Sequence, residues 1–233
     1  MEAQLDHLVI AAPDLASGVL WCERTLGVTP APGGAHPLMG THNRLVRLQG
    51  GRFDKAYLEI IAIDPAAKPE RQAPRARWFD LDNPAFLAKL ERDGAQLAHW
   101  VVRTENVADA VGAWQRLGID RGRILAASRM SARGLLTWQI TVRDDGQRLF
   151  DGCLPTLIEW GPVHPAPALA EQGVTLNDFS VSHPDAATIT EALSVIGLAG
   201  VNTTLGPASL NAGLIRPDGA LRTLVTPSVQ ALF

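Results

Sequence analysis

Two His and Glu pairs recur along the chain with nearly the same separation. His7 and Glu59 are 52 residues apart, and His99 and Glu159 are 60 residues apart. Each His stands in a short strand-like segment, and each Glu in an apolar strand-like segment further on. Imidazole nitrogens and carboxylate oxygens suit a divalent transition metal such as Ni, Zn, Mn, Co or Fe. If the two pairs face each other, these four residues predict one metal site.

The residues around the first pair permit this arrangement. Side chains alternate between the two faces of a strand, so His7 shares a face with Leu5 and Val9. In the same way Glu59 shares a face with its apolar neighbours two positions away. A lone Glu on such a face is costly to bury without a partner. Taken singly, each His is better explained as a core imidazole bonded to backbone, but matched ligands in two repeats favour metal.

The elements that position these residues also repeat. Three stretches open on a strand pattern, pass a polar turn and continue as an amphipathic helix that closes on Gly, over residues 5–27, 97–118 and 176–197. Asp14, Asn106 and Asp185 are each placed to cap the first turn of a helix. Gly27, Gly118 and Gly197 suit the left-handed ends of the same helices.

Short β-type segments follow each helix, so the repeated unit is βαβββ. The sequence predicts an α+β protein: tandem βαβββ modules forming curved half-barrel sheets around a shared cavity, with a third, shorter module appended. The expected divisions are module 1 (1–63), a connector with a short helix (64–96), module 2 (97–162) and a divergent third module (163–233). The expected strands after the helices are 37–41, 43–48, 56–63, 124–130, 135–142, 155–160, 201–204, 209–216 and 221–226.

The connector is longer than most and therefore wraps a module edge or covers a site. It holds Arg71, Arg75 and Arg77 beside Trp78 and Phe79. A solvated connector with an aromatic anchor is favoured over an anion-binding lid, because arginine is mostly exposed in proteins. A short helix is expected over 84–92.

Composition excludes several classes of protein. The net charge of −3 and the lack of a dense basic tract argue against nucleic-acid binding. No apolar run is long enough to span a bilayer, and the N-terminus shows no signal peptide, so neither a membrane nor secretion is expected. With only Cys22 and Cys153, free thiols in a reducing cytoplasm are expected.

At this point the chain resembles the glyoxalase-like branch of the vicinal oxygen chelate superfamily. The resemblance is carried by the segments 5–9, 40–43 and 57–62, that is, LDHLV, GTHN and YLEIIA. It covers residues 4–162 clearly and the third module loosely. It implies paired modules around a cavity in which, in catalytic members, a divalent metal chelates vicinal oxygens of a small substrate.

Carried over onto this chain, the resemblance assigns His7, Glu59, His99 and Glu159 as metal ligands. A metal there would polarise a carbonyl and stabilise an enediolate, while a carboxylate that detaches from it acts as base. Glu159 is the first candidate for this catalytic role and Glu59 the second. Asp178 stands where a third His would be. The third module is therefore expected to be structural, filling an edge or mediating contacts in a homodimer.

Further polar residues are candidates for substrate contacts. The segment around His42 and Asn43 either binds substrate or stabilises a turn. Only one of Trp138 and Gln139 can face the cavity, and Trp138 is the better candidate for a buried position. Gly33-Gly34 is read as a turn. The histidines beside prolines are expected in exposed loops, namely His36, His164 and His183.

The favoured function is a metal-dependent enzyme of the glyoxalase type, a lyase or isomerase that transfers protons on a small oxygenated or carbonyl compound. One alternative is a metal-free protein that sequesters a small molecule in the same cavity, as bleomycin-resistance relatives do. In that case His7 and Glu59 would pair with each other or with backbone. Another is an iron-dependent dioxygenase, which needs two His and one Glu on one ion.

Overall fold

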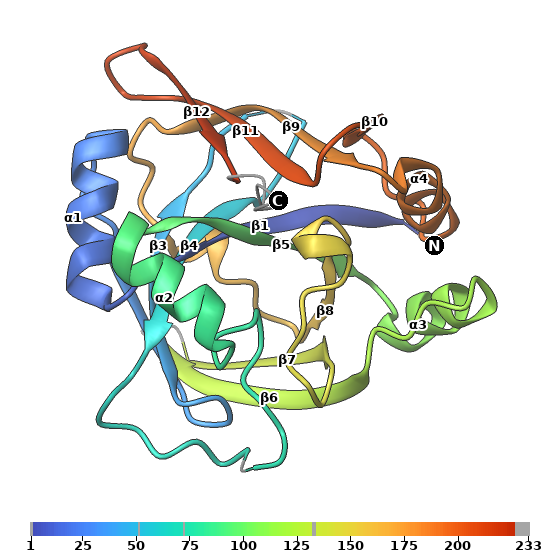
Figure 1. The fold of residues 1–233 in the computed structure, drawn as a ribbon. Helices are drawn as coiled ribbons and strands as arrows, with labels where there is room; N and C mark the ends of the chain where they lie inside the picture. Colours follow the sequence, from blue (N-terminus) through green and yellow to red (C-terminus); the bar gives the residue numbers. More distant parts are fainter. Residues whose placement is uncertain (1, 51, 72, 132–133, 227–233) are drawn as a thin grey trace.

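The computed structural model describes residues 2–226 except 51, 72, 132 and 133. Strands and helices alternate in the order that the sequence predicts (Figure 1). The bounds are β1 (Ala3–Ala11), α1 (Leu15–Leu26), β2 (Ala31–His36), β3 (Thr41–Arg47), β4 (Tyr57–Ile63), α2 (Pro84–Asp93), β5 (Gln96–Thr104), α3 (Val107–Arg116), β6 (Arg123–Ser131), β7 (Gly134–Val142), β8 (Thr156–Trp160), β9 (Thr175–His183), α4 (Ala186–Val195), β10 (Asn202–Leu205), β11 (Ser209–Ile215) and β12 (Leu221–Val225).

Capping residues set the limits of the helices, as expected for two of the three repeats. The Asp14 carboxylate accepts a hydrogen bond from a first-turn amide of α1, and Gly27 ends that helix with a φ of 74°. Asn106 caps α3 in the same way. Asp185 precedes α4, but its side chain accepts no capping hydrogen bond from the described residues. Its backbone N–H donates to the His183 ring instead.

The first eight strands form one curved sheet in the order β2-β3-β4-β1-β5-β8-β7-β6. β1 and β5 lie antiparallel at its centre, and each pairs in parallel with the last strand of its own unit, β4 or β8. The edge strands β2 and β6 come into contact, so the sheet nearly closes into a barrel. This confirms the α+β architecture of curved sheets around a common interior.

Alternation along the strands separates two apolar clusters. Side chains such as Val9 and Ile61 point into the barrel, where they meet Trp138 and Ile158. The alternate residues face outward and pack beneath the helices and a second sheet. The interior is therefore the place where β1, β4, β7 and β8 can bring polar side chains together.

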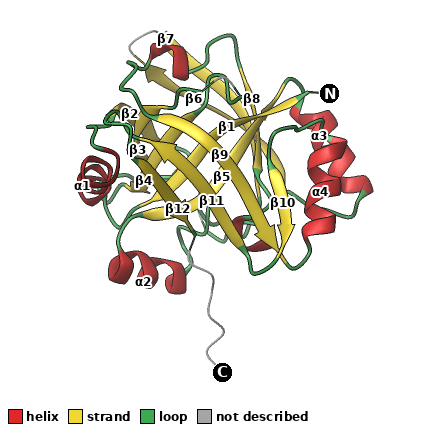
Figure 2. Ribbon diagram, turned by 90° about the horizontal axis from the view of Figure 1, so that it is seen from above, coloured by secondary structure: helices red, strands yellow, loops and turns green. Residues whose placement is uncertain are grey.

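The second sheet crosses the outer face of β1 and β5 (Figure 2). Its strand order is β10-β9-β11-β12, so β9 lies between β10 and β11. The third unit thus shares the element order of the first two but not their strand pairing, in which the first strand pairs with the last. α4 contacts α3 at one side of the molecule. None of the helices in the described part of the chain is both long and apolar enough to cross a membrane.

Two local expectations are wrong. The second strand covers residues 31–36, and the expected strand 37–41 is mostly a turn. Gly33 and Gly34 belong to that strand, with a register shift between Pro32 and Ala35. Glycine at 33 is required by close packing, since a Cβ there would lie 1.9 Å from the Asn43 Oδ1 atom.

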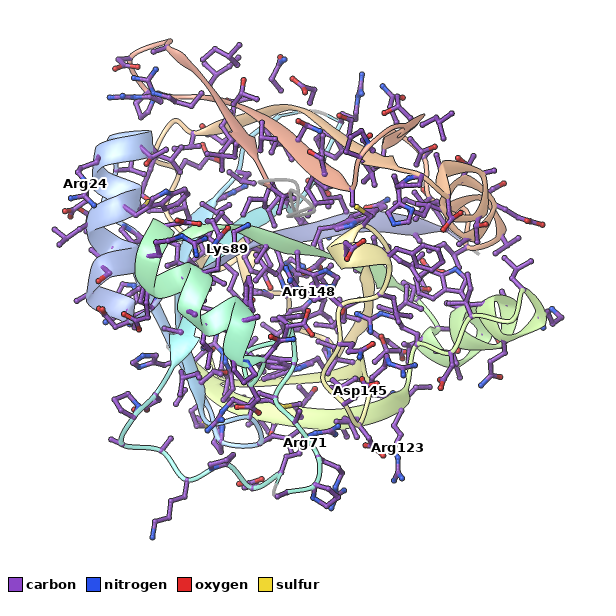
Figure 3. The ribbon with its side chains drawn as sticks, in the orientation of Figure 1. Arg24, Arg71, Lys89, Arg123, Asp145 and Arg148 are labelled. Carbon is purple, nitrogen blue, oxygen red and sulfur yellow. The ribbon has the colours of Figure 1, made fainter. Side chains whose placement is uncertain are left out.

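The connector covers the barrel and is only partly solvated. Trp78 and Phe79 are buried in the interior, and Arg71 is also buried. The guanidinium of Arg71, a residue labelled in Figure 3, donates to the backbone carbonyl of Arg143 and to the Asp144 carboxylate. The aromatic pair anchors the connector as expected, but Arg71 binds protein groups and does not face solvent.

Candidate functional site

His7 and Glu59 meet inside the barrel. They lie on the parallel neighbours β1 and β4, where Val9 is in register with Glu59. The His7 Nε2 atom is 3.5 Å from a Glu59 carboxylate oxygen. His7 is 4% exposed and Glu59 6%, so the pair is shielded from water. The first predicted pair therefore forms a buried site.

Asp6 contacts the His7 ring nitrogen that faces away from Glu59. The Asp6 carboxylate is fully buried and lies 2.6 Å from the His7 Nδ1 atom. Its other oxygen accepts hydrogen bonds from Trp160 Nε1 and His164 Nε2, at 3.0 and 2.9 Å. A register shift between Leu5 and His7 accompanies this arrangement. A carboxylate bonded to one ring nitrogen orients the other nitrogen, which here faces Glu59.

Asn43 holds the opposite side of Glu59. Its Nδ2 atom donates to Glu59 Oε1 at 2.6 Å, while its Oδ1 accepts from the backbone N–H of Gly34 at 2.8 Å. The second bond determines which way round the amide lies. Asn43 Nδ2 is also 3.3 Å from His36 Nε2, and the other His36 nitrogen is 3.0 Å from the Thr41 hydroxyl. One chain of hydrogen bonds thus links the polar residues of β2, β3 and β4.

Charges in this network follow from burial and hydrogen bonding. Burial disfavours the imidazolium of His7, but the hydrogen bond to Asp6 and the nearby charge of Glu59 outweigh it and raise the pKa of His7 to about 9. Burial opposes ionisation of both carboxyls. Hydrogen bonds from His164 and His7 nevertheless keep the pKa of Asp6 below its usual value, and the charge of His7 together with the Asn43 hydrogen bond does the same for Glu59. Burial lowers the pKa of His36 to about 4. Near neutral pH the site holds two carboxylates, one imidazolium and one neutral imidazole.

Aromatic and apolar side chains enclose the network. The His7 ring stacks on Tyr57 with centroids 4.6 Å apart. A void of about 30 Å³ lies beside the network, which is enough for roughly one water molecule. Its lining combines the polar groups with residues from both halves of the barrel: His7, His36, Asn43, Leu45, Tyr57, Glu59, Trp78, Phe79, Arg129, Trp138, Ile140, Ile158 and Trp160.

Trp78 and Phe79 of the connector close the site. Phe79 and Asp80 have φ values of 59° and 60°, a left-handed conformation that is strained for a bulky residue. The Asp80 carboxylate accepts from Arg148 at 2.8 Å, and its backbone N–H donates to the Gly146 carbonyl. These contacts hold Trp78 and Phe79 against the void. Trp78 Nε1 is buried and has no hydrogen-bond partner among the described residues.

His99 does not join the pair. It is fully buried, but its Nδ1 atom is 3.1 Å from the Gly152 carbonyl and its Nε2 atom is 2.9 Å from the Thr156 hydroxyl. The buried guanidinium of Arg121 also lies 3.3 Å from Nε2. Burial and this positive charge keep the pKa of His99 well below its usual value. Both ring nitrogens are thus engaged with protein groups, which corrects the expectation of a ligand.

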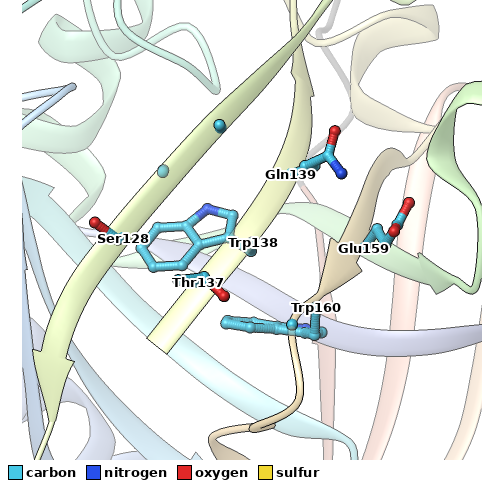
Figure 4. Close-up of a pocket in the computed structure, with 9 residues that line it drawn as sticks. Ser128, Thr137, Trp138, Gln139, Glu159 and Trp160 are labelled. Carbon is cyan, nitrogen blue, oxygen red and sulfur yellow. The ribbon is translucent and has the colours of Figure 1, made fainter. Parts of the chain in front are cut away.

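Glu159 lies on the outer face of the sheet. In β8 the neighbours Ile158 and Trp160 face the barrel, so alternation directs Glu159 away from it. Its carboxylate accepts a hydrogen bond from the Val107 backbone N–H at the start of α3. Glu159 pairs across the strands with Gln139, and the two side chains lie together in an outer groove (Figure 4). The expected metal-binding and catalytic role of Glu159 therefore has no support from this position.

The remaining predicted contacts divide by strand face. Asn43 and Trp138 face the interior and line the void, whereas His42 points outward and lies 4.0 Å from Asp64. The expectation of exposed loop histidines is wrong. His36 and His183 are buried on strands, and His164 is mostly buried against Asp6.

The four-ligand metal site is not assembled. Two of its members meet and the other two are held elsewhere, and no three His, Cys, Asp or Glu side chains in the described ranges converge to hold an ion. His36 is the further imidazole near Glu59, at 4.0 Å, but its Nε2 atom faces the Asn43 amide. The donor set fits a hydrogen-bonded network better than a metal centre.

Sequence reasoning did not identify several residues of the site. Asp6 directly precedes the selected His7, and an acid beside a His is a signal that could have indicated it. The proline beside His36 indicates a loop, so the local sequence does not indicate a site residue there. Arg129 and Trp160 reach the void only because the barrel nearly closes, so no local pattern indicates them.

Comparison with known families agrees with this fold. A family model described as a glyoxalase-like domain matches residues 5–197. A comparison with curated proteins found no match.

Several solved structures align with this chain. A hypothetical protein from Staphylococcus aureus aligns with a TM-score of 0.56 and 13% identity, over 96% of this chain and 85% of that one. Methylmalonyl-CoA epimerase from Streptomyces coelicolor, in complex with 2-nitronate-propionyl-CoA, aligns at 18% identity with a TM-score of 0.42, over 68% and 98% of the two chains. The epimerase from Mycobacterium tuberculosis gives 16% and 0.38, over 71% and 91%. At these identities the comparisons concern the fold alone.

Proposed function

The chain belongs to the glyoxalase-like domain family, and from that premise we propose that its barrel interior is an active site for proton transfer on a small carbonyl compound. The observation that carries the proposal is the buried Glu59 carboxylate, held by Asn43 on one oxygen and facing His7 with the other. A carboxylate kept ionised in a water-poor cavity beside an imidazolium is suited to act as base next to an electrophile.

The two oxygens of Glu59 have different roles in this proposal. Oε1 accepts the short bond from Asn43, which fixes the carboxylate. Oε2 lies 3.5 Å from His7 Nε2, beyond good hydrogen-bond distance, so it is the more available oxygen. It takes the proton from the carbon next to the substrate carbonyl. The protonated His7 then donates to the carbonyl oxygen as negative charge develops there.

Asp6 is a positioning residue in the same scheme. Its bond to Nδ1 directs Nε2 of His7 into the site, and its own bonds from Trp160 and His164 hold the carboxylate in place. The surrounding aromatic walls exclude water, which strengthens charge interactions between the site and the substrate.

The mechanism contains no metal step. The sequence predicts a divalent transition metal on four ligands, but only His7 and Glu59 of these approach one another. The iron-dependent dioxygenase would require a second imidazole on the ion, and His36 Nε2 instead faces the Asn43 amide. The hydrogen-bonded arrangement is therefore the basis of the proposal.

Deuterium exchange tests the reaction class. We would incubate the protein in D₂O with hydroxyacetone, dihydroxyacetone and pyruvate and follow the loss of proton signals next to the carbonyl by NMR. The expected result is exchange above the blank that falls at least about 100-fold in Glu59→Gln, as for loss of a general base. Glu159→Gln is the matched control. If the exchange rate fell strongly in Glu159→Gln but not in Glu59→Gln, the assignment of Glu59 as the base would be contradicted.

Metal analysis tests the ligand geometry independently. Tag-free protein would be analysed after incubation with Ni²⁺, Zn²⁺, Mn²⁺ and Fe²⁺, together with His7→Ala and Glu59→Ala. We expect no stoichiometric ion. One transition metal per chain, lost in both variants, would overturn the metal-free mechanism.

A metal-free binding protein is the second candidate function. The direct approach of His7 to Glu59 favours it, because that pairing is what a site without metal predicts. Binding of small carbonyl compounds without exchange on any of them, in wild-type and Glu59→Gln alike, would support this candidate over the enzyme.

A further inference from the structure

Arg129 places an unpaired cation at the cavity. It lies on β6, where Leu125 and Ala127 at alternate positions pack into the barrel interior. Its guanidinium lies across the gap between the edge strands, against Gly34 of β2. A Cβ at position 34 would be 2.8 Å from the Arg129 Nη1 atom, so glycine makes room for this side chain.

Among the residues that the structure describes, neither Arg129 nor Trp78 Nε1 has a hydrogen-bond or ion-pair partner. His7 and Glu59, the other charged residues of the lining, have partners in the protein. No described residue forms a hydrogen bond or an ion pair with Arg129. Trp78 is 5% exposed and its indole N–H is unsatisfied. Buried donors are rarely left without an acceptor, because the loss of hydration is costly. The Trp78 N–H therefore lacks an acceptor beside a cavity that the partly exposed Arg129 also lines, and a ligand bound there would supply acceptors to both.

The position of Arg129 also identifies the entrance. Every residue that lines the void is buried except Arg129 and Trp160, which are partly exposed. The lining is therefore closest to solvent at these two side chains. A ligand that enters here meets the guanidinium first and the His7 and Glu59 pair behind it. The present void is small, so entry requires these two side chains to move outward.

We propose that Arg129 and the Trp78 indole N–H form a subsite for a carboxylate, so that the substrate of this cavity is a small 2-oxo or 2-hydroxy acid. This inference rests on the proposed proton-transfer function and names its substrate class. A guanidinium presents two parallel N–H groups that match the two oxygens of a carboxylate. The single indole N–H adds one more donor, whereas a phosphate would leave further oxygens without donors. In a 2-oxo acid the ketone oxygen then faces His7, and the carbon on the other side of the ketone, which carries the exchangeable protons, faces Glu59. In a 2-hydroxy acid the carbon that carries the hydroxyl faces Glu59.

Binding measurements test the subsite. The probes are pyruvate, glyoxylate and lactate, with hydroxyacetone as a neutral analogue of pyruvate and inorganic phosphate as a competing anion. Dissociation constants would be measured by ligand-observed NMR on the full chain. We expect at least about 10-fold tighter binding of pyruvate than of hydroxyacetone, as for a charge-assisted bidentate contact. The subsite would be overturned if hydroxyacetone bound as tightly as pyruvate, or if phosphate bound as tightly as any of the acids. It would also be overturned if none of the three acids bound at about 10 mM, which we take as the weakest dissociation constant for specific binding.

Variants separate the subsite from a general charge effect. Arg129→Gln should weaken pyruvate binding about 10- to 100-fold. Trp78→Phe should weaken it less, by several fold. The matched control is Arg123→Gln, on the same strand but 65% exposed and paired with Asp144 (Figure 3). Equal losses in Arg129→Gln and Arg123→Gln would overturn the assignment, and thermal unfolding would confirm that each variant folds.

Glu59→Gln distinguishes this inference from the proposed function. It should abolish exchange while pyruvate still binds through Arg129. Exchange lost in Glu59→Gln with binding unaffected in Arg129→Gln would overturn the subsite and leave the proton-transfer function standing. Binding that depends on Arg129, with exchange unchanged in Glu59→Gln, would support the subsite and contradict the proposed base.

Discussion

Asn43 connects the chemistry of the site to the backbone around it. Its amide nitrogen holds Glu59, and its amide oxygen is held by the Gly34 N–H. Gly33 packs so closely that a side chain there would overlap both the Asn43 amide and its carbonyl. The absence of side chains at Gly33 and Gly34 therefore lets the Asn43 amide lie close to β2, where it orients Glu59, the proposed base.

Gly33→Ala tests this dependence. The added Cβ would lie 1.9 Å from Asn43 Oδ1, so Asn43 must move and Glu59 loses its donor. We expect the free energy of unfolding to fall by about 1–3 kcal/mol, as when a buried group loses its partner, and exchange activity to fall with it. The control is Gly112→Ala, within α3, where the nearest atom is 3.8 Å away. It should raise stability by about 0.5–1 kcal/mol. An unchanged Gly33→Ala protein in urea unfolding would contradict this account.

His7 and His36 should be in opposite protonation states at neutral pH. The Asp6 hydrogen bond and the charge of Glu59 raise the pKa of His7 to about 9 despite burial, while burial lowers that of His36 to about 4. The stability from His7 is thus complete below its unfolded pKa of 6.5 and is lost as pH rises through about 9. For His36 the depressed pKa means that stability is lost as pH falls from 6.5 toward about 4.

Nitrogen-15 NMR of the imidazoles measures these states directly. At pH 7 we expect His7 with protons on both ring nitrogens and His36 with one. A neutral His7 at pH 7 would remove the proposed electrophile, and a charged His36 would contradict its hydrogen bond from Asn43.

At the scale of elements, helix limits follow from capping residues near in sequence. α1 begins after Asp14 and ends before Gly27, and both positions are visible in the sequence as cap signals. The face of the sheet on which a strand residue lies is harder to predict from the sequence. β8 is five residues long, and its register places Ile158 and Trp160 inside and Glu159 outside. A shift of one residue reverses this assignment, which is why the sequence could not show that Glu159 faces outward.

The two aspartates before α1 and α4 provide a matched comparison. Asp14 accepts hydrogen bonds from the backbone N–H and the hydroxyl of Ser17, at 2.8 and 2.6 Å, whereas Asp185 makes no capping bond to described residues. Asp14→Ala should lower the free energy of unfolding by about 1 kcal/mol, and Asp185→Ala by much less. Chemical denaturation of both variants measures this, and equal losses would show that the cap is not the cause.

At the scale of the whole molecule, the second sheet completes the core on the outer side of the barrel. Phe179 of β9 packs against Trp100 of β5 with ring centroids 5.0 Å apart, and both are buried. β1 and β5 carry His7 and His99 on their inner side, so the outer face needs this cover. The second sheet therefore supports the strands that position the site without itself lining the void.

Phe179→Ala tests the cover. Removing a fully buried ring should cost about 3–5 kcal/mol of stability, because it leaves a cavity in the core. Leu205→Ala in the same sheet should have little effect, since Leu205 is 81% exposed. Urea unfolding measures both, and in folded protein the exchange activity of Phe179→Ala should remain close to wild type. If fully folded Phe179→Ala lost most of its exchange activity, the second sheet would have a direct role in the function.

The sequence by itself determined the α+β class, the repeated βαβββ order and most helix limits, because these depend on periodicity and caps. It also identified His7 and Glu59 as candidates, although their approach depends on the pairing of β1 with β4. Only the tertiary structure decided the rest. The register of β8 sends Glu159 outward, Thr156 and Arg121 engage His99, and the approach of β2 to β6 brings Arg129 to the cavity. These outcomes depend on contacts between residues far apart in the chain, which no local pattern of residue types encodes.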